Sequence, residues 1–72
     1  MQYAIVIEKS ETGWGAYVPD LPGCVAVAES EEEVRHLVRE AIEFHLEGLR
    51  EDGAVIPQAS ARVEYVEILH AA

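Results

Sequence analysis

The feature that most constrains the fold is one long amphipathic segment that begins at Ser30 and ends at Gly53. Ser30 is followed three residues later by Glu33, so the serine hydroxyl can accept the Glu33 amide while the Glu33 carboxylate reaches back, which forms a capping box. The apolar residues between these ends recur at helical spacing and are Val34, Leu37, Val38, Ala41, Ile42, Leu46 and Leu49. The pattern predicts one helix of roughly six turns, closed by a glycine, whose broad apolar face another element must cover.

Three short segments before this helix have the composition of strands. Residues 2–8 are rich in aromatic and β-branched side chains and end at a polar turn that contains glycine. Residues 14–18 form a second such segment, and residues 24–28 form a third. Between them, residues 19–23 contain two prolines and a glycine, which indicate a rigid corner. We therefore expect three antiparallel strands.

The segment after the helix is expected to return to the sheet. Residues 54–61 contain Pro57 and no periodic pattern, which indicates a loop. Residues 62–69 are predicted to form a last strand, and His70 to Ala72 a frayed end. The predicted order is βββ-α-β, an α+β fold with an antiparallel three- to four-stranded sheet and one long helix. The 72 residues allow one domain, residues 1–72.

Both faces of this sheet are predicted to carry apolar side chains, although one helix covers only one face. The first strand turns Tyr3, Ile5 and Ile7 to one side and Ala4 and Val6 to the other. A domain of this size buries only about 60% of its unfolded surface and often needs a partner. We expect the second face to contact another protein and the chain to be at least a dimer; an ordinary exposed surface is the alternative.

The chain is strongly acidic, with 5 Lys and Arg against 14 Asp and Glu and a net charge of −9. This charge repels phosphate backbones, so we expect no direct nucleic-acid binding, whereas a basic protein would be attracted. Glu29, Glu31, Glu32 and Glu33 gather at the predicted helix start, where negative charge complements the helix dipole. As an alternative, Glu31 and Glu32 could face a basic partner, since Glu33 is committed to the cap.

The residues that could carry chemistry do not indicate an enzyme. The single cysteine, Cys24, excludes an internal disulfide or a multi-cysteine metal cluster and is expected to be a small buried residue. His45 lies within the apolar stripe, and no other histidine is spaced with it as a ligand pair. It is expected to be packed and hydrogen-bonded. No metal or cofactor is predicted.

The start of the chain does not resemble a targeting or membrane segment. Residues 1–7 are apolar, but they lack a basic start and are too short to span a membrane. We therefore expect a cytosolic protein without a membrane partner.

Three residues before the helix are candidates for a protein contact. Trp14 and Tyr17 are large aromatic residues of the kind that anchor interfaces, although they are equally normal in a half-buried strand. Asp20 is expected to accept backbone amides of the turn that follows it, with a partner contact as the alternative.

Several runs of this sequence resemble the HicB antitoxin family. They are Y-A-I-V-I-E from Tyr3, W-G-A-Y-V-P-D-L-P-G-C-V from Trp14, the Ser30 capping segment, E-A-I-E-F-H-L-E-G-L-R-E-D-G from Glu40, and I-P at Ile56. The resemblance covers about Tyr3 to Pro57. It implies a partial ribonuclease H-like fold and a partner resembling HicA, a small basic toxin that cleaves messenger RNA. Many members also carry a C-terminal DNA-binding segment, and this chain is expected to be a short form without one.

Two other functions remain open at this point. The chain could be an orphan oligomeric domain of the same family type with another interaction role. It could also be a metal-dependent nuclease, which would need several carboxylates around two metal ions. The centre of the first strand, however, is Ala4, Ile5 and Val6, and the nearby Glu8 lies at the strand end. A non-enzymatic binding module is therefore the preferred interpretation.

Overall fold

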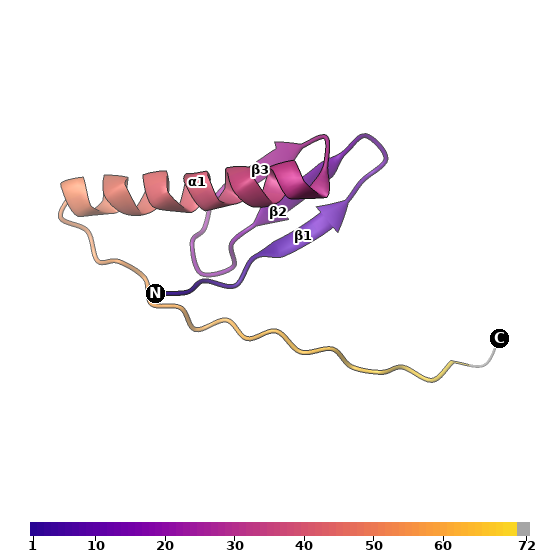
Figure 1. Cartoon of the computed structure of the whole chain (residues 1–72). Coiled ribbons are helices and arrows are strands. Elements are labelled where there is room, and N and C mark those ends of the chain that lie inside the picture. The colour runs from indigo at the N-terminus through magenta and orange to yellow at the C-terminus, as the bar shows by residue number, and fades with distance from the viewer. Residues whose placement is uncertain (71–72) are drawn as a thin grey trace.

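A computed structural model of the chain describes residues 1–70 and contains three antiparallel strands followed by one long helix (Figure 1). The elements are β1 (Val6–Lys9), β2 (Trp14–Tyr17), β3 (Val25–Ala28) and α1 (Glu31–Glu51). The strands follow the order β1-β2-β3, with β1 and β3 at the two edges of the sheet. The helix lies across one face of this sheet, which confirms the predicted α+β class and the order of its first four elements.

The helix begins and ends where the sequence predicts. The Ser30 hydroxyl accepts the Glu33 amide at 3.1 Å, and the Glu33 carboxylate accepts the Glu29 amide at 3.1 Å. At the other end Gly53 has a φ of 68°, in the left-handed region that favours glycine. Its amide donates to the Arg50 carbonyl, and the next amide, that of Ala54, donates to the Leu49 carbonyl. This pair of bonds is a Schellman motif, which satisfies carbonyls that the helix itself leaves free.

The core lies between α1 and the sheet. Its buried side chains are Ala16, Val18, Leu21, Cys24, Val34, Val38 and Leu46. Leu21 reaches the core from the corner between β2 and β3, where the Leu21 amide donates to Val18 and the Cys24 amide donates to Leu21. Cys24 is 4% exposed, and its burial raises the pKa of the thiol. The prediction that Cys24 is a small buried residue is confirmed.

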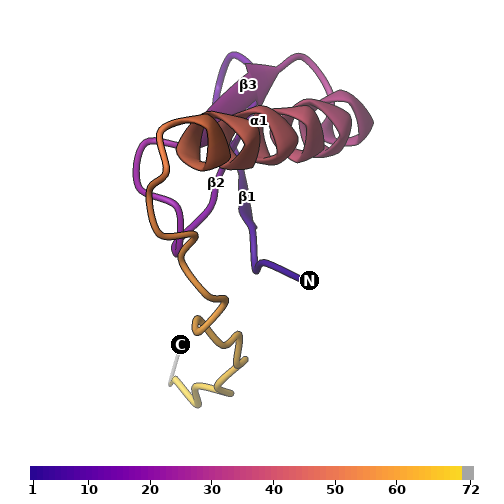
Figure 2. The same ribbon diagram turned by 90° about the vertical axis from the view of Figure 1, so that its left-hand side faces the viewer.

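The predicted last strand over residues 62–69 is wrong. Residues 54–70 are extended but pair with no other described strand, and beyond Ala61 they leave the domain (Figures 1 and 2). We call residues 62–70 the tail. The radius of gyration is 14.7 Å, whereas a compact chain of this length would have about 11 Å. Strand propensity is realised only when a segment lies beside another strand, and the tail points away from β1, the free edge of its own sheet (Figure 1). Of the predicted frayed end, Ala71 and Ala72 lie outside the described residues.

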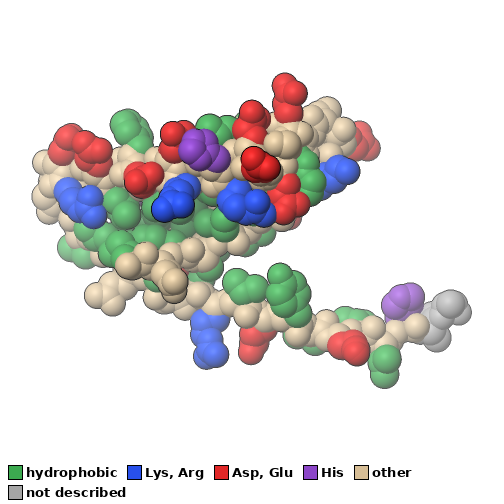
Figure 3. Space-filling view, viewed as in Figure 1, with side chains coloured by type: hydrophobic (Ala, Val, Ile, Leu, Met, Phe, Trp, Pro, Cys, Tyr) green, Lys and Arg blue, Asp and Glu red, His purple; other side chains and the backbone are tan. Residues whose placement is uncertain are grey.

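Within residues 1–70, no helix has both the length and the apolar character that crossing a bilayer requires. The side of α1 turned away from the sheet is instead charged, as Figure 3 shows.

Candidate functional site: the open face of the sheet

The face of the sheet opposite α1 is uncovered by any described residue and carries apolar side chains. The strand register aligns Val6 with Tyr17 and Tyr17 with Val25 across the three strands. Tyr17 is 43% exposed, Val25 63% and Val27 77%. We call Val6, Tyr17, Val25 and Val27 the open face. Neighbouring exposed apolar side chains of this kind are typical of protein-binding surfaces.

The open face ends in a shallow acidic hollow. Gly15 pairs with Glu8 on one side and with Val27 on the other. Because Gly15 has no side chain, the surface is lowered there, and a hollow of about 640 Å³ extends toward the helix start. The carboxylates that line it belong to Glu8, Glu29 and Glu33. An apolar surface therefore continues into a negatively charged one.

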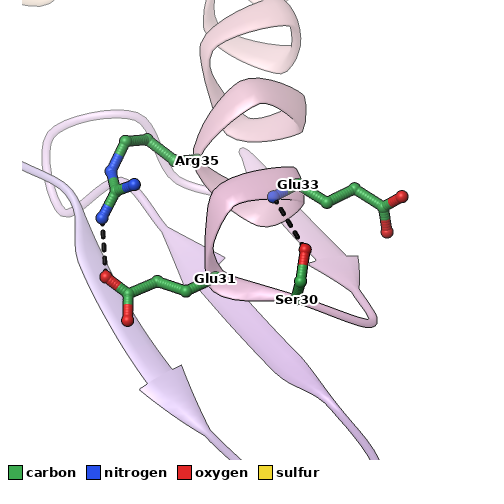
Figure 4. A network of polar contacts seen from close by, with 4 residues as sticks. All are labelled: Ser30, Glu31, Glu33 and Arg35. Carbon is green, nitrogen blue, oxygen red and sulfur yellow. Dashed lines mark hydrogen bonds and ion pairs between the residues drawn. The ribbon is translucent and has the colours of Figure 1, made fainter.

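The acidic first turn of α1 adjoins this hollow. Glu31 accepts a hydrogen bond from the Arg35 guanidinium at 2.6 Å, and both side chains are about half exposed (Figure 4). An exposed pair of this kind adds little stability, roughly 0–1 kcal/mol. Glu32 is exposed, with no partner among the described residues. Glu31 and Glu32 thus lie together at the surface, as the sequence predicts.

The two candidate aromatic residues lie on opposite faces of the sheet. Trp14 is on the helix side, half-buried against the core, and the Lys9 ammonium lies 5.8 Å from the centre of its ring. Tyr17 is on the open face. Because successive strand residues alternate between faces, positions 14 and 17 have to separate in this way. Of the two, only Tyr17 belongs to the open face.

Asp20 was expected to accept amides of the turn that follows it, and this expectation is wrong. Its carboxylate accepts the Ser60 amide, the Ser60 hydroxyl and the Ala61 amide, each at 3.0 Å, from 40 to 41 residues further along the chain. The Ala61 amide and then both Ser60 groups hold the pKa of Asp20 below its ordinary value, although burial opposes this. The Tyr3 hydroxyl also donates to the Pro57 carbonyl. Together these bonds fasten residues 57–61, which lead into the tail, to the domain.

His45 is half-buried beside Phe44 and Cys24 at the edge of the interface between α1 and β3. The side-chain hydrogen bonds of the described residues do not include one to His45, so the expected bond is not found. Among residues 1–70, His, Cys, Asp and Glu do not form a group of three that could hold a metal ion.

The five predicted contact residues therefore do not form one site. Tyr17 belongs to the open face, and Glu31 and Glu32 belong to the first turn of α1 beside the acidic hollow. Trp14 lies on the covered face, and Asp20 holds Ser60 and Ala61. Val25 and Val27 were not among the predicted contact residues. Their signal was the alternation of valine and alanine in residues 24–28, which places both valines on the face opposite the core.

Comparison with known proteins gives consistent matches. Residues 3–69 match the model of the HicB-like antitoxin family of bacterial toxin–antitoxin systems. A UPF0150 protein of Archaeoglobus fulgidus is 49% identical over 78% of this chain and 86% of its own length. Antitoxin HicB 2 of Photorhabdus laumondii is 30% identical over 94% of this chain. This chain spans 50% of that antitoxin and 50% of a similar uncharacterised protein of Haemophilus phage HP1.

A solved structure has the same fold. One chain of a HicA3 and HicB3 toxin–antitoxin complex superposes with a TM-score of 0.71 and 28% identity, covering 83% of this chain and 70% of that one. The family resemblance noted in the sequence thus extends to residue 69 and to the three-dimensional structure. The chain belongs to the HicB-like antitoxin family of bacterial toxin–antitoxin systems.

Proposed function

We propose that this chain is a non-enzymatic antitoxin module that binds and occludes a small, basic, messenger-RNA-cleaving toxin of the HicA type. Family membership supports the antitoxin role, and the similar solved chain comes from a HicA3 and HicB3 complex. The toxin would be met in the cytoplasm, where its substrate is translated. In this proposal the chain itself does not contact nucleic acid, and it self-associates.

One observation carries the choice of surface: the open face continues into the acidic hollow. An apolar centre bordered by charge is the usual anatomy of a protein interface. Tyr17, Val25 and Val27 would supply apolar contact area, and Glu31 and Glu32 would face basic side chains of the toxin. The net charge of −9 would attract such a partner from a distance.

The experiment is surface-plasmon kinetics against the product of a neighbouring gene that encodes a small basic protein. Raising salt should slow association far more than it speeds dissociation, because the Debye length falls from about 10 Å at 0.1 M to about 3 Å at 1 M. Glu31→Lys with Glu32→Lys should have the same effect as salt. Glu47→Lys with Glu51→Lys makes an equal change of net charge at the other end of α1 and should slow association less.

A second pair of variants tests the open face. Val25→Ser with Val27→Ser should speed dissociation, because the apolar contact area is lost while the charge is unchanged. Both side chains are exposed, so the fold is retained. Unchanged dissociation would move the interface elsewhere, and no binding at any salt concentration would favour an orphan interaction module. RNA cleavage that needs Mg²⁺ and disappears in Glu8→Gln would instead make the chain a nuclease.

A further inference from the structure

The tail has the composition of a buried strand but lies in solvent. Its large apolar side chains are exposed to between 61% and 97% of their surface; they are Val63, Tyr65, Val66, Ile68 and Leu69. From Val55 to His70 the backbone makes no backbone hydrogen bond with another described residue. Such a segment is a ready partner for the free edge of a sheet.

The residues just before the tail are held in place, and the tail itself points away from its own sheet. The three bonds from Asp20 hold Ser60 and Ala61 in place. From there the tail diverges from β1 in both views (Figures 1 and 2). Residues 61–70 contain neither glycine nor proline with which to turn back. The tail is therefore presented to another molecule.

The same domain offers an unfilled place for a strand. The edge of β1 is free, and α1 packs mainly over β2 and β3. This leaves a groove of about 410 Å³ between α1 and the start of the chain. Its apolar lining consists of Met1, Tyr3, Ile5, Val38, Ile42 and Leu46. An additional strand beside β1 would cover this groove.

The charges of the two surfaces are complementary. Arg35 and Arg39 border the groove together with Glu43, and Figure 3 shows a row of basic side chains along the edge of α1 above an apolar band. Because Arg35 is paired with Glu31, Arg39 is the basic side chain that can face a tail. The tail carries Glu64 and Glu67 among its apolar residues. Since the faces of a strand alternate, either face of the tail turned to the groove carries one of these carboxylates. Two chains of net charge −9 repel each other, so a basic border is where they can meet.

We propose that the tail of one copy adds as a strand to the free edge of β1 in a second copy and fills that copy's groove. The exchange is mutual, because each copy has one tail and one groove. In this arrangement residues 62–69, predicted as the fourth strand, pair with β1 of the second copy and not with their own sheet. This inference rests on the proposed self-association and is independent of toxin binding.

The first test compares two double variants of the full chain by sedimentation over a range of concentrations. Tyr65→Ser with Leu69→Ser should weaken dimerisation by about tenfold or more, because it removes apolar anchors. Val25→Ser with Val27→Ser removes comparable apolar side chains from the open face and should leave dimerisation unchanged. All four side chains are exposed in the single copy, so neither variant unfolds the domain.

The second test distinguishes exchange between copies from docking within one copy. Arg39→Glu alone and Glu64→Arg with Glu67→Arg alone should each dimerise poorly, because like charges then meet at the groove. Mixing the two variants should restore a dimer, since each tail then faces an oppositely charged groove. Arg50→Glu matches the net charge of Arg39→Glu about three turns further along α1 and should dimerise normally.

The possible outcomes distinguish self-association in general from exchange of the tail. A parent chain that stays monomeric at high concentration overturns both the proposed self-association and the exchange. A dimer that survives the tail variant but not the open-face variant keeps self-association and overturns the exchange. Charge variants that do not rescue each other on mixing also overturn it.

Discussion

The helix α1 and the tail both mix apolar and charged residues, but only α1 is packed against the sheet. Both alternate apolar residues with charged ones, α1 at helical spacing and the tail at nearly strand spacing. In α1 the amides beyond the first turn bond to carbonyls four residues earlier, and the Ser30 hydroxyl accepts the Glu33 amide, so the segment satisfies most of its own backbone. In the tail each amide needs a second strand, and the tail points away from the free edge of its own sheet (Figure 1). A helix can thus be completed locally, whereas a strand depends on a neighbour.

The largest expected difference between the two regions is in packing. Leu21 is fully buried beneath α1, so Leu21→Ala should reduce the free energy of unfolding by about 2–5 kcal/mol. Leu69→Ala makes the same chemical change at a side chain that is 94% exposed, and it should change stability by less than about 0.5 kcal/mol. Urea unfolding followed by circular dichroism, at concentrations too low for self-association, measures both. A similar cost at both positions would mean that the tail is packed in solution.

The reactivity of thiols compares the buried core with the exposed tail within one molecule. Cys24 is buried, and its raised pKa lowers the fraction of reactive thiolate. In the variant Val66→Cys, at concentrations too low for self-association, the added tail thiol should react with an aromatic disulfide reagent about tenfold faster or more than Cys24. The measurement is the time course of the released chromophore, which should show a fast and a slow phase of equal amplitude. A single phase would show that the core opens as freely as the tail.

The helix α1 can be weakened at its N-cap, Ser30. Ser30→Ala leaves the Glu33 amide without its acceptor and should reduce the free energy of unfolding by about 1 kcal/mol. Ser30→Asp retains an acceptor and adds charge that suits the helix dipole, so it should restore stability. Thermal unfolding of the three proteins provides the measurement. Equal stability of all three would mean that packing alone sets where α1 begins.

The smallest expected effect is at Asp20, because it fastens only the start of the tail. Its folded pKa lies below the ordinary value of 3.8, so its bonds contribute above that value. They are lost as the pH falls through the lowered pKa, when the carboxylate is protonated. The amide resonances of Ser60 and Ala61 should shift at that acidic pH and be displaced at neutral pH in Asp20→Asn. Asp52→Asn, at the end of α1, should leave them unchanged, and a midpoint above 3.8 would contradict the bonding described.

The parts that could be predicted from the sequence are those whose causes are local. The capping box at Ser30 and the glycine at position 53 each act within a few residues, so they gave the correct ends of α1. The separation of Trp14 from Tyr17 is also local, because the pleat of a strand fixes the side of each residue. The burial of Cys24 followed from its place at a strand start after a rigid corner.

The rest depended on contacts between distant residues. Asp20 was expected to bind its own turn, but its carboxylate accepts hydrogen bonds from Ser60 and Ala61, which lie 40 and 41 residues further along the chain. Residues 62–69 were correctly recognised as strand-forming in composition, but whether they pair depends on the position of β1 and the direction set at Ala61. The open face was anticipated as an apolar surface, whereas its continuity with the acidic hollow depends on how the hairpin meets α1.

The sequence by itself therefore determined the helix, the strand faces and the acidic character of this protein, because hydrogen bonds between near neighbours and the repeat of side chains along the backbone are local properties. Only the tertiary structure decided which surfaces stay uncovered and where the tail points. Those features arise from the relative placement of elements that have no local preference for one another.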